Sequence, residues 1–390
     1  MYDHVIRGSA DAGATAWRHP SSNWLPGRAL STARCSSTPT CSRCTSHAYS
    51  SNGRFHLIEH QLPLTPRNGT AVTWIASSPD ARREQFGRFL LGTGNIGGLA
   101  ATTGRGIGLS DDEGFNLIDR ALTEGAKIID TSDIYAGGNS ERVVGTWRQA
   151  HPKSDALIQT KTGVTADGPN LAPERVRQQL QRSIAVLGRV DLYLAHAVDP
   201  NTSWSESLPV FSTAVENGHI LAYGLSNVDE AALSSALETA DRLGLVRPEL
   251  VQNAYSLIVR DDDRSVLPLV AAEGLAYTPY SPLANGILAG RYSKGEQPVR
   301  GTRASTSPRA PGLLANPAVI GQVREFDQLA AERKVSPAGL ALAWVTHHPL
   351  LTAPVIGISN AAQWQGVHEA RQIDWTVELA ERINEIFPAN

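Results

Sequence analysis

The stretch that decides the fold is Lys127-Ile128-Ile129-Asp130-Thr131-Ser132-Asp133-Ile134-Tyr135. It opens with a short apolar run, and polar side chains follow as soon as that run ends. Runs of this kind are typical of strands that are buried on both faces of a parallel sheet. The stretch therefore predicts a buried strand with Asp130 at its carboxyl end and Tyr135 in the loop beyond.

Seven other apolar runs share this character, and longer amphipathic segments separate them. The runs are residues 89–93, 156–160, 191–196, 222–226, 250–253, 276–280 and 353–357, and helical patterns include residues 112–124, 173–187, 229–243 and 317–334. Buried strands that alternate with helices predict an α/β protein with a parallel sheet covered by helices. Eight such units over about 300 residues fit a closed (β/α)8 barrel, the TIM barrel.

An open, doubly wound sheet is the alternative fold. Residues 92–97 read Gly-Thr-Gly-Asn-Ile-Gly and match the dinucleotide-binding pattern G-x-G-x-x-G. In such a fold a helix follows this pattern directly. Residues 98–108 are instead rich in glycine, alanine and threonine, which indicates a loop. The barrel is therefore the preferred prediction.

The composition narrows the functional classes. The chain is 41% hydrophobic and 19% charged, with a formal net charge of -3, so it lacks the basic surface that nucleic-acid binding requires. No apolar run approaches the roughly 18 residues of a membrane span, and the N-terminus lacks a secretory signal pattern. All 3 cysteines lie in the first fifty residues, so we expect a reducing, cytoplasmic setting.

The N-terminal part of the chain has a different character. Residues 1–84 are rich in serine, threonine, arginine, proline and glycine and lack apolar periodicity, so we predict a disordered or non-native extension, with the barrel domain at 85–390. Met1 is the only methionine, which leaves open a start near Val72 in the native protein. Cys41 and Cys44 have metal-site spacing but no supporting pattern, so we predict no metal site.

Polar residues at successive strand ends point to one chemistry. Asp130, Lys161 and His196 each close an apolar run, and the carboxyl ends of barrel strands meet at one rim, where active sites form. An ammonium group next to Tyr135 favours its phenolate, a carboxylate compensates the buried ammonium, and a histidine can hydrogen-bond a carbonyl oxygen. Asp133 competes with Asp130 for the carboxylate role, but it lies beyond the strand and suits a loop cap.

These motifs together make the chain resemble the aldo-keto reductase family over residues 88–385. Residues 114–135 resemble the family signature around the catalytic Asp and Tyr, while QTKTG around Lys161 and DLYLAHAVDP around His196 match the other two catalytic positions. The resemblance implies a barrel that binds NADPH without a separate dinucleotide domain. A hydride then passes to an aldehyde or ketone while Tyr135 donates the proton.

The resemblance also implies a set of cofactor-binding residues. These are Thr93, Gly94, Ser226, Asn227, Gln252, Tyr280, Ser281, Leu283, Gly286, Arg291, Arg303, Gly357, Ser359 and Gln363. Three departures from the family pattern matter, one of them the long loop at residues 293–317, which is rich in proline, glycine and serine. The short hairpin that closes the barrel bottom is not recognisable in residues 82–88, and the segment from Gly357 to Val367 has no lysine or arginine to pair with a 2′-phosphate. We expect NADP as the cofactor, with NAD as the alternative.

Three functions follow from these residues. The first is a reductase of small aldehydes or ketones. The second is a regulatory or binding subunit that keeps bound NADPH and turns over little. The third is a sugar or alcohol dehydrogenase that works oxidatively, because the same four groups serve both directions. We expect a monomer or a weakly associating homo-oligomer with no nucleic-acid or membrane partner.

Overall fold

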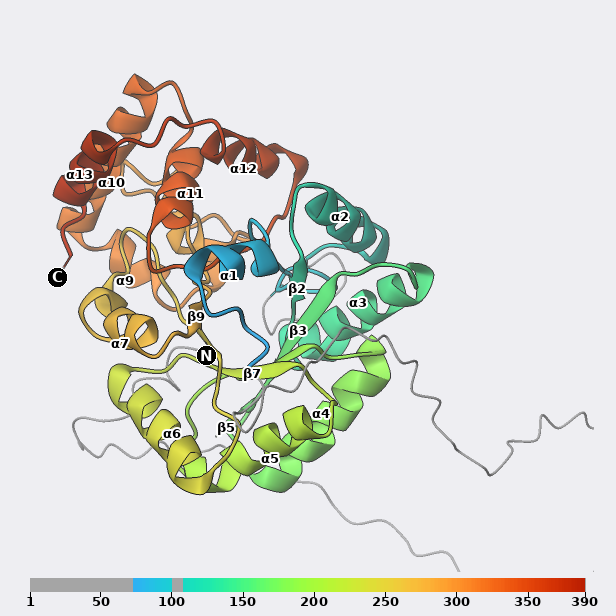
Figure 1. Cartoon of the computed structure of the whole chain (residues 1–390). Helices are drawn as coiled ribbons and strands as arrows, with labels where there is room; N and C mark the ends of the chain where they lie inside the picture. Colours follow the sequence, from blue (N-terminus) through green and yellow to red (C-terminus); the bar gives the residue numbers. More distant parts are fainter. Residues whose placement is uncertain (1–72, 100–107, 390) are drawn as a thin grey trace, which may run out of the picture. The chain divides into compact units, whose positions relative to one another are not determined.

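A computed structural model describes residues 73–99 and 108–389. Its centre is a parallel sheet of 8 strands in the order β10-β1-β2-β3-β6-β7-β8-β9 (Figure 1). A parallel bridge between Tyr280 and Val355 joins the end of β9 to β10 and closes the ring. The described part of the chain is therefore a (β/α)8 barrel, as the sequence predicts.

The strands coincide with the eight predicted apolar runs. They are β1 (Leu90–Gly92), β2 (Ile128–Asp130), β3 (Leu157–Thr162), β6 (Leu192–Ala195), β7 (Ala222–Ser226), β8 (Leu250–Gln252), β9 (Ala276–Tyr277) and β10 (Val355–Ile356). A small antiparallel pair, β4 (Val164–Thr165) and β5 (Gly168–Pro169), follows β3. The four helical patterns predicted above correspond to α2 (Asp111–Thr123), α4 (Pro173–Leu187), α6 (Glu230–Leu243) and α10 (Pro317–Glu332).

Helices surround the barrel because their apolar faces cover the strands. The helices are α2 (Asp111–Thr123), α3 (Asn139–Ala150), α4 (Pro173–Leu187), α5 (Trp204–Glu216), α6 (Glu230–Leu243), α7 (Val266–Ala272), α8 (Arg303–Thr306), α9 (Ala310–Leu314), α10 (Pro317–Glu332), α11 (Pro337–His347), α12 (Trp364–Ala370) and α13 (Val377–Ile386). Local sequence sets where they begin: Ser110 and Glu113 form a capping box at the start of α2. Among the described residues, no helix is long and apolar enough to cross a membrane.

A short N-terminal segment covers one end of the barrel, where the family resemblance implies a hairpin. Helix α1 (Pro79–Phe86) and the residues before it place Ile75 and Phe86 in a cluster with the side chains of the strand starts. Glu249, just before β8, accepts hydrogen bonds from the backbone N–H groups of Trp74 and Ile75 at 3.1 and 2.6 Å. The Arg82 guanidinium donates to the carbonyls of Gly274 and Leu275.

The boundary predicted between residues 84 and 85 thus falls inside α1. Residues 73–84 lack an apolar period, yet they pack on the barrel through Ile75 and through backbone and guanidinium hydrogen bonds that no sequence pattern encodes. Residues 1–72, with Cys41 and Cys44, lie outside the described residues. The division into an extension and a barrel domain stays a prediction.

Candidate active site

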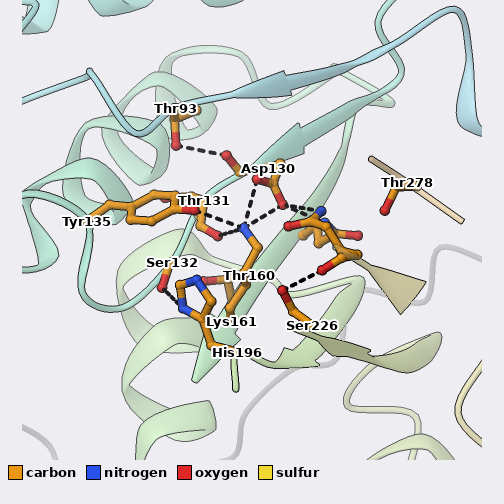
Figure 2. Close-up of polar contacts among 12 residues, drawn as sticks. Thr93, Asp130, Thr131, Ser132, Tyr135, Thr160, Lys161, His196, Ser226 and Thr278 are labelled. Atoms are coloured by element: carbon orange, nitrogen blue, oxygen red, sulfur yellow. Dashed lines mark hydrogen bonds and ion pairs between the residues drawn. The ribbon is translucent and has the colours of Figure 1, made fainter. Parts of the chain in front are cut away.

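Asp130 and Lys161 meet at the carboxyl ends of neighbouring strands. The register pairs Asp130 of β2 with Gln159 of β3, and Lys161 lies two residues further along β3. Its Nζ lies 2.7 Å from the Asp130 carboxylate and 2.9 Å from the Thr131 carbonyl oxygen (Figure 2). Burial alone would lower the pKa of Lys161, but attraction to Asp130 and Tyr135 outweighs it, and the net pKa is raised. The ammonium therefore stays charged inside the barrel.

Two amide side chains complete the surroundings of the Asp130 carboxylate. Gln159 and Gln252 both donate from Nε2 to Asp130 Oδ1, the latter at 3.3 Å. Gln159 is absent from the predicted site. The signal that would have found it is the two-residue period of a strand, which puts residues 159 and 161 on the same face.

Tyr135 lies beside the same ammonium group. It begins the short 3-10 helix η1 (Tyr135–Gly138) after β2, and its hydroxyl is 3.5 Å from Lys161 Nζ. The Tyr135 ring is half-buried and meets the His196 ring edge-on, with ring centroids 5.8 Å apart. The four side chains predicted to be catalytic therefore lie together (Figure 2).

His196 follows β6, and the Ser132 hydroxyl contacts one of its ring nitrogens. The Ser132 hydroxyl oxygen lies 3.0 Å from His196 Nδ1. Burial, and then the Lys161 charge, hold the pKa of His196 well below its usual value. The imidazole is therefore neutral at physiological pH and can act only through hydrogen bonds of defined direction.

Asp133, the competing carboxylate, occupies different surroundings. Its Oδ2 lies 3.6 Å from the Arg175 guanidinium of α4 and accepts a hydrogen bond from Thr162 at 3.2 Å. Burial and the negative charge of Glu141 raise the pKa of Asp133 to about 7. The structure thus places Asp130, and not Asp133, next to Lys161.

A second polar group lies where β1 meets β2. Thr93 Oγ1 donates to the Asp130 carbonyl oxygen at 2.9 Å and accepts from Ser140 Oγ at 2.9 Å. A Cβ added at Gly94 would lie 3.8 Å from the Tyr135 ring. Thr93 and Gly94, both predicted to contact the cofactor, therefore adjoin the predicted catalytic residues.

On the other side of the barrel mouth, β7, β8 and the end of β9 bring four predicted residues together. Asn227 Nδ2 donates to the His196 carbonyl oxygen at 2.8 Å, and Tyr280 donates from its hydroxyl to Asn227 Oδ1 at 2.7 Å. Ser226 Oγ donates to the Gln252 carbonyl oxygen at 2.7 Å. Asn227 has a φ of 57°, an arrangement in which a non-glycine residue is strained and which concentrates at functional sites.

The loop after Tyr280 carries the next residues predicted to bind the cofactor, and these residues have different surroundings. Ser281 has a φ of 56° and its Oγ lies 3.4 Å from Asn285 Oδ1, while Leu283 packs against the main core. Gly286 is half-buried with a φ of 94°. Arg291 and Arg303 are exposed, and neither guanidinium forms a hydrogen bond or ion pair within the described residues. No hydrogen bond or ion pair between described side chains therefore links these two arginines to the site.

The segment after β10 is linked to β1 by an asparagine that the sequence analysis missed. Asn95 donates from Nδ2 to the Ile358 carbonyl oxygen at 2.7 Å and to Ser359 Oγ at 3.2 Å. The Ser359 backbone N–H donates to Gln363 Oε1 at 2.6 Å. Gly357, like Ser359, is exposed at this rim. Asn95 lies within the residue 92–97 motif, so its position in that glycine-rich turn was the available signal.

Comparison with known proteins gives consistent matches. The model described as "Aldo/keto reductase family" matches residues 90–387. An uncharacterized oxidoreductase of Bacillus subtilis (strain 168), YrpG, is 30% identical over 317 residues, which cover 77% of this chain and 92% of the relative. A putative voltage-gated potassium channel subunit beta of Schizosaccharomyces pombe is 30% identical over 70% of this chain and 83% of its own length. Versiconal hemiacetal acetate reductase of Aspergillus parasiticus is 26% identical over 74% and 91%.

In residues 73–99 and 108–389, no group of three or more His, Cys, Asp or Glu side chains is arranged to hold a metal ion.

Proposed function

The chain belongs to the aldo/keto reductase family, and on that basis we propose that it is an NADPH-linked oxidoreductase that reduces an aldehyde or ketone to an alcohol. The observation that carries the proposal is the Lys161 ammonium, which touches both the Asp130 carboxylate and the Tyr135 hydroxyl. Relatives named as an oxidoreductase and a reductase agree with this class of reaction.

Each proposed catalytic side chain has one task. Tyr135 donates its hydroxyl proton to the carbonyl oxygen of the substrate, and the adjacent Lys161 ammonium stabilises the phenolate that remains. Asp130 holds the ammonium in place and balances its charge. His196, uncharged and next to Tyr135, orients the substrate oxygen by a hydrogen bond. The proton and the compensating charge are thus supplied by the protein.

The residues present fit a nicotinamide dinucleotide, which when bound supplies the hydride that no side chain can provide. Two buried amide oxygens, Asn95 Oδ1 and Gln159 Oε1, have no hydrogen-bond partner in the described part of the chain, which is typical of a site open to a polar ligand. We propose that the ligand is held by Thr93, Gly94, Ser226, Asn227, Gln252, Tyr280, Ser281, Leu283, Gly286, Arg291, Arg303, Gly357, Ser359 and Gln363.

The choice between NADP and NAD depends on the few cationic side chains among the predicted cofactor-binding residues. Residues 357–367 contain no lysine or arginine, so Arg303 and Arg291 are the predicted residues with charge to offer a 2′-phosphate. We propose NADP as the cofactor, with NAD as the alternative. Titration of protein fluorescence with NADPH and with NADH measures both dissociation constants. An Arg303→Ala variant that weakens NADPH alone supports the proposal, and equal affinity for the two cofactors contradicts it.

The reaction itself is tested by NADPH oxidation with a simple aromatic aldehyde. Tyr135→Phe should lower kcat by about 10²- to 10⁴-fold, because the variant lacks the proton donor. Tyr223→Phe is the matched control, since its hydroxyl donates to the Val246 carbonyl oxygen and to none of the four proposed catalytic side chains. Turnover by Tyr135→Phe at the wild-type rate would show that the mechanism is wrong.

A second candidate function is a regulatory or binding subunit that retains NADPH with little turnover. The observation in its favour is the relative named as a putative voltage-gated potassium channel subunit beta. Tight NADPH binding without turnover on a panel of aldehydes and ketones would favour this role. Turnover of NADP with alcohols or sugars, and none of NADPH with carbonyls, would favour an oxidative enzyme.

The remaining proposals concern the setting of the protein. We propose a cytoplasmic setting, because the cysteines are confined to the first fifty residues. We also propose a division of the chain into an extension at residues 1–84 and a barrel domain at residues 85–390. We propose a monomer or weakly associating homo-oligomer with a small carbonyl or alcohol substrate. Light scattering over a range of protein concentrations tests the oligomeric state.

A further inference from the structure

A chain of two hydrogen bonds links a buried carboxylate to the histidine of the proposed active site. Ser132 Oγ donates to Asp133 Oδ1 at 3.2 Å and lies 3.0 Å from His196 Nδ1. Ser132 and His196 are both buried, and Figure 2 shows the serine hydroxyl pointing at the imidazole. Asp133 takes no part in the Lys161–Asp130 pair, so the mechanism above leaves this chain unused.

A serine hydroxyl has one proton, and this sets the direction of both bonds. An ionised carboxylate can only accept, so the Ser132 proton points to Asp133. The serine oxygen must then accept from His196, which requires the proton of the neutral imidazole to be on Nδ1. The second ring nitrogen, Nε2, is left with a lone pair and can only accept a hydrogen bond.

We propose that Asp133 is a positioning residue that acts through the Ser132 hydroxyl to set the proton of His196: on Nδ1 while Asp133 is ionised, and on Nε2, from which it can donate to the substrate carbonyl oxygen, once Asp133 is protonated. This inference deepens the proposed function and rests on it for the role of His196. With the proton on Nδ1, His196 accepts a hydrogen bond from the hydroxyl of Tyr135 or of an alcohol. With the proton on Nε2, it donates one to a carbonyl oxygen.

The groups around Asp133 hold its carboxylate in one orientation. Oδ2 faces Arg175 of α4 and Thr162 of β3, which leaves Oδ1 for Ser132. Glu141 of α3 adds a negative charge, and the Tyr193 hydroxyl of β6 is also close enough to interact. Because burial and Glu141 raise the pKa of Asp133 to about 7, the carboxylate ionises within an accessible pH range.

The same orientation predicts what Asp133→Asn will do. The amide oxygen should remain at the Oδ2 position, since Thr162 donates there and the Arg175 guanidinium lies 3.6 Å away. The amide nitrogen then takes the place of Oδ1 and donates to Ser132 Oγ. Ser132 must now donate to His196 Nδ1, so the imidazole proton moves to Nε2. A protonated Asp133 has the same effect, because its hydroxyl donates to Ser132.

The tautomer can be observed directly by NMR of ¹⁵N-histidine-labelled full-length protein, with the His196 signal identified by its loss in His196→Gln. At about pH 8.5 the wild type should carry the proton on Nδ1, and at about pH 5.5 on Nε2. Asp133→Asn should show the Nε2 form at both pH values. Asp155→Asn is the control and should behave as wild type, because Asp155 is exposed and lies before the start of β3, whereas Lys161 lies near the end of that strand.

Two results would overturn the proposal. One is a wild-type imidazole with its proton on Nε2 at about pH 8.5. The other is a Ser132→Ala variant whose tautomer still changes with pH as the wild type does, because the link to Asp133 is then missing. Neither readout requires turnover, so a failure of the proposed enzyme activity is recognised separately.

Activity supplies a second readout. The kcat/KM for carbonyl reduction should be about three- to tenfold higher for Asp133→Asn than for wild type at about pH 8.5, the worth of one hydrogen bond, and the two should converge at about pH 5.5. A wild-type to variant ratio that is constant over this pH range would contradict the inference, because loss of structure alone would not follow the ionisation of Asp133.

Discussion

The ammonium nitrogen of Lys161 lies 2.7 Å from the Asp130 carboxylate, and the two side chains are 0% and 3% exposed. Such a pair is stable as a unit because each charge compensates the burial of the other. It also means that neither residue can be changed without affecting its partner. The geometry of the proposed active site and the stability of the barrel are therefore coupled at this position.

Lys161→Met should lower the free energy of unfolding by about 3–5 kcal/mol, because Asp130 is left as a buried charge without its partner. Asp130→Asn in the same chain should recover part of that loss, since the amide is neutral and Gln159 and Gln252 remain beside it. Urea unfolding of the two single variants and the double variant measures the coupling. Simple additivity of the two losses would argue against a compensated pair.

Glu249 should make stability depend on pH. Burial raises the pKa of Glu249 to about 7 in the folded protein, above the ordinary value of 4.5. The folded state therefore binds more protons between these values, and the contribution of Glu249 to stability falls as pH rises through about 7. From about pH 5 to about pH 8, the free energy of unfolding of the wild type should fall by roughly 2–3 kcal/mol relative to that of Glu249→Gln.

The measurement is urea unfolding of both proteins across this range. If the free energy of unfolding depends on pH in the same way for wild type and Glu249→Gln, the pKa of the buried Glu249 carboxyl, which accepts from the backbone of Trp74 and Ile75, does not change on folding. A separate effect of Asp133 is common to both proteins and cancels in the difference.

Gly145 should tolerate no side chain. A Cβ at Gly145 of α3 would lie 2.0 Å from the Val186 carbonyl oxygen of α4. Gly145→Ala should therefore destabilise the protein by about 1–3 kcal/mol, since the helices must move apart. Gly321→Ala in α10 is the matched control: no atom lies within 4 Å of its Cβ, and better helix propensity should stabilise by about 0.5–1 kcal/mol. Thermal unfolding of both variants distinguishes close packing from propensity.

Asn227 combines a backbone task and a side-chain task. Its φ of 57° lies in the left-handed region. Its side-chain amide donates to the His196 carbonyl oxygen and accepts from the Tyr280 hydroxyl. Asn227→Ala should be less stable than Asn227→Gly by about 1 kcal/mol, because glycine adopts this conformation without strain. Both variants should weaken NADPH binding alike, as each lacks the amide. Unequal dissociation constants would assign the effect to the backbone.

Much of the fold followed from local pattern. The short apolar runs became the strands, because a strand buried on both faces needs apolar residues throughout whatever its neighbours are. The rule that strand carboxyl ends share one rim then predicts that Asp130, Lys161 and His196 lie together. The two-residue period of β3 would also have indicated Gln159, because it lies on the same face of the strand as Lys161.

Other features depend on contacts between distant segments. No period in residues 73–84 indicates that Ile75 and α1 cover the barrel end, because what holds them is Glu249, more than 170 residues away in the chain. Likewise, no motif indicates that Arg175 of α4 pairs with Asp133. The sequence alone determined the strands, their order and the residues at their ends, since these follow from local burial and chirality. Only the tertiary structure decided that Asp133 meets Arg175 and that Glu249 meets the backbone of Ile75, because these contacts depend on helix and segment packing across the whole barrel.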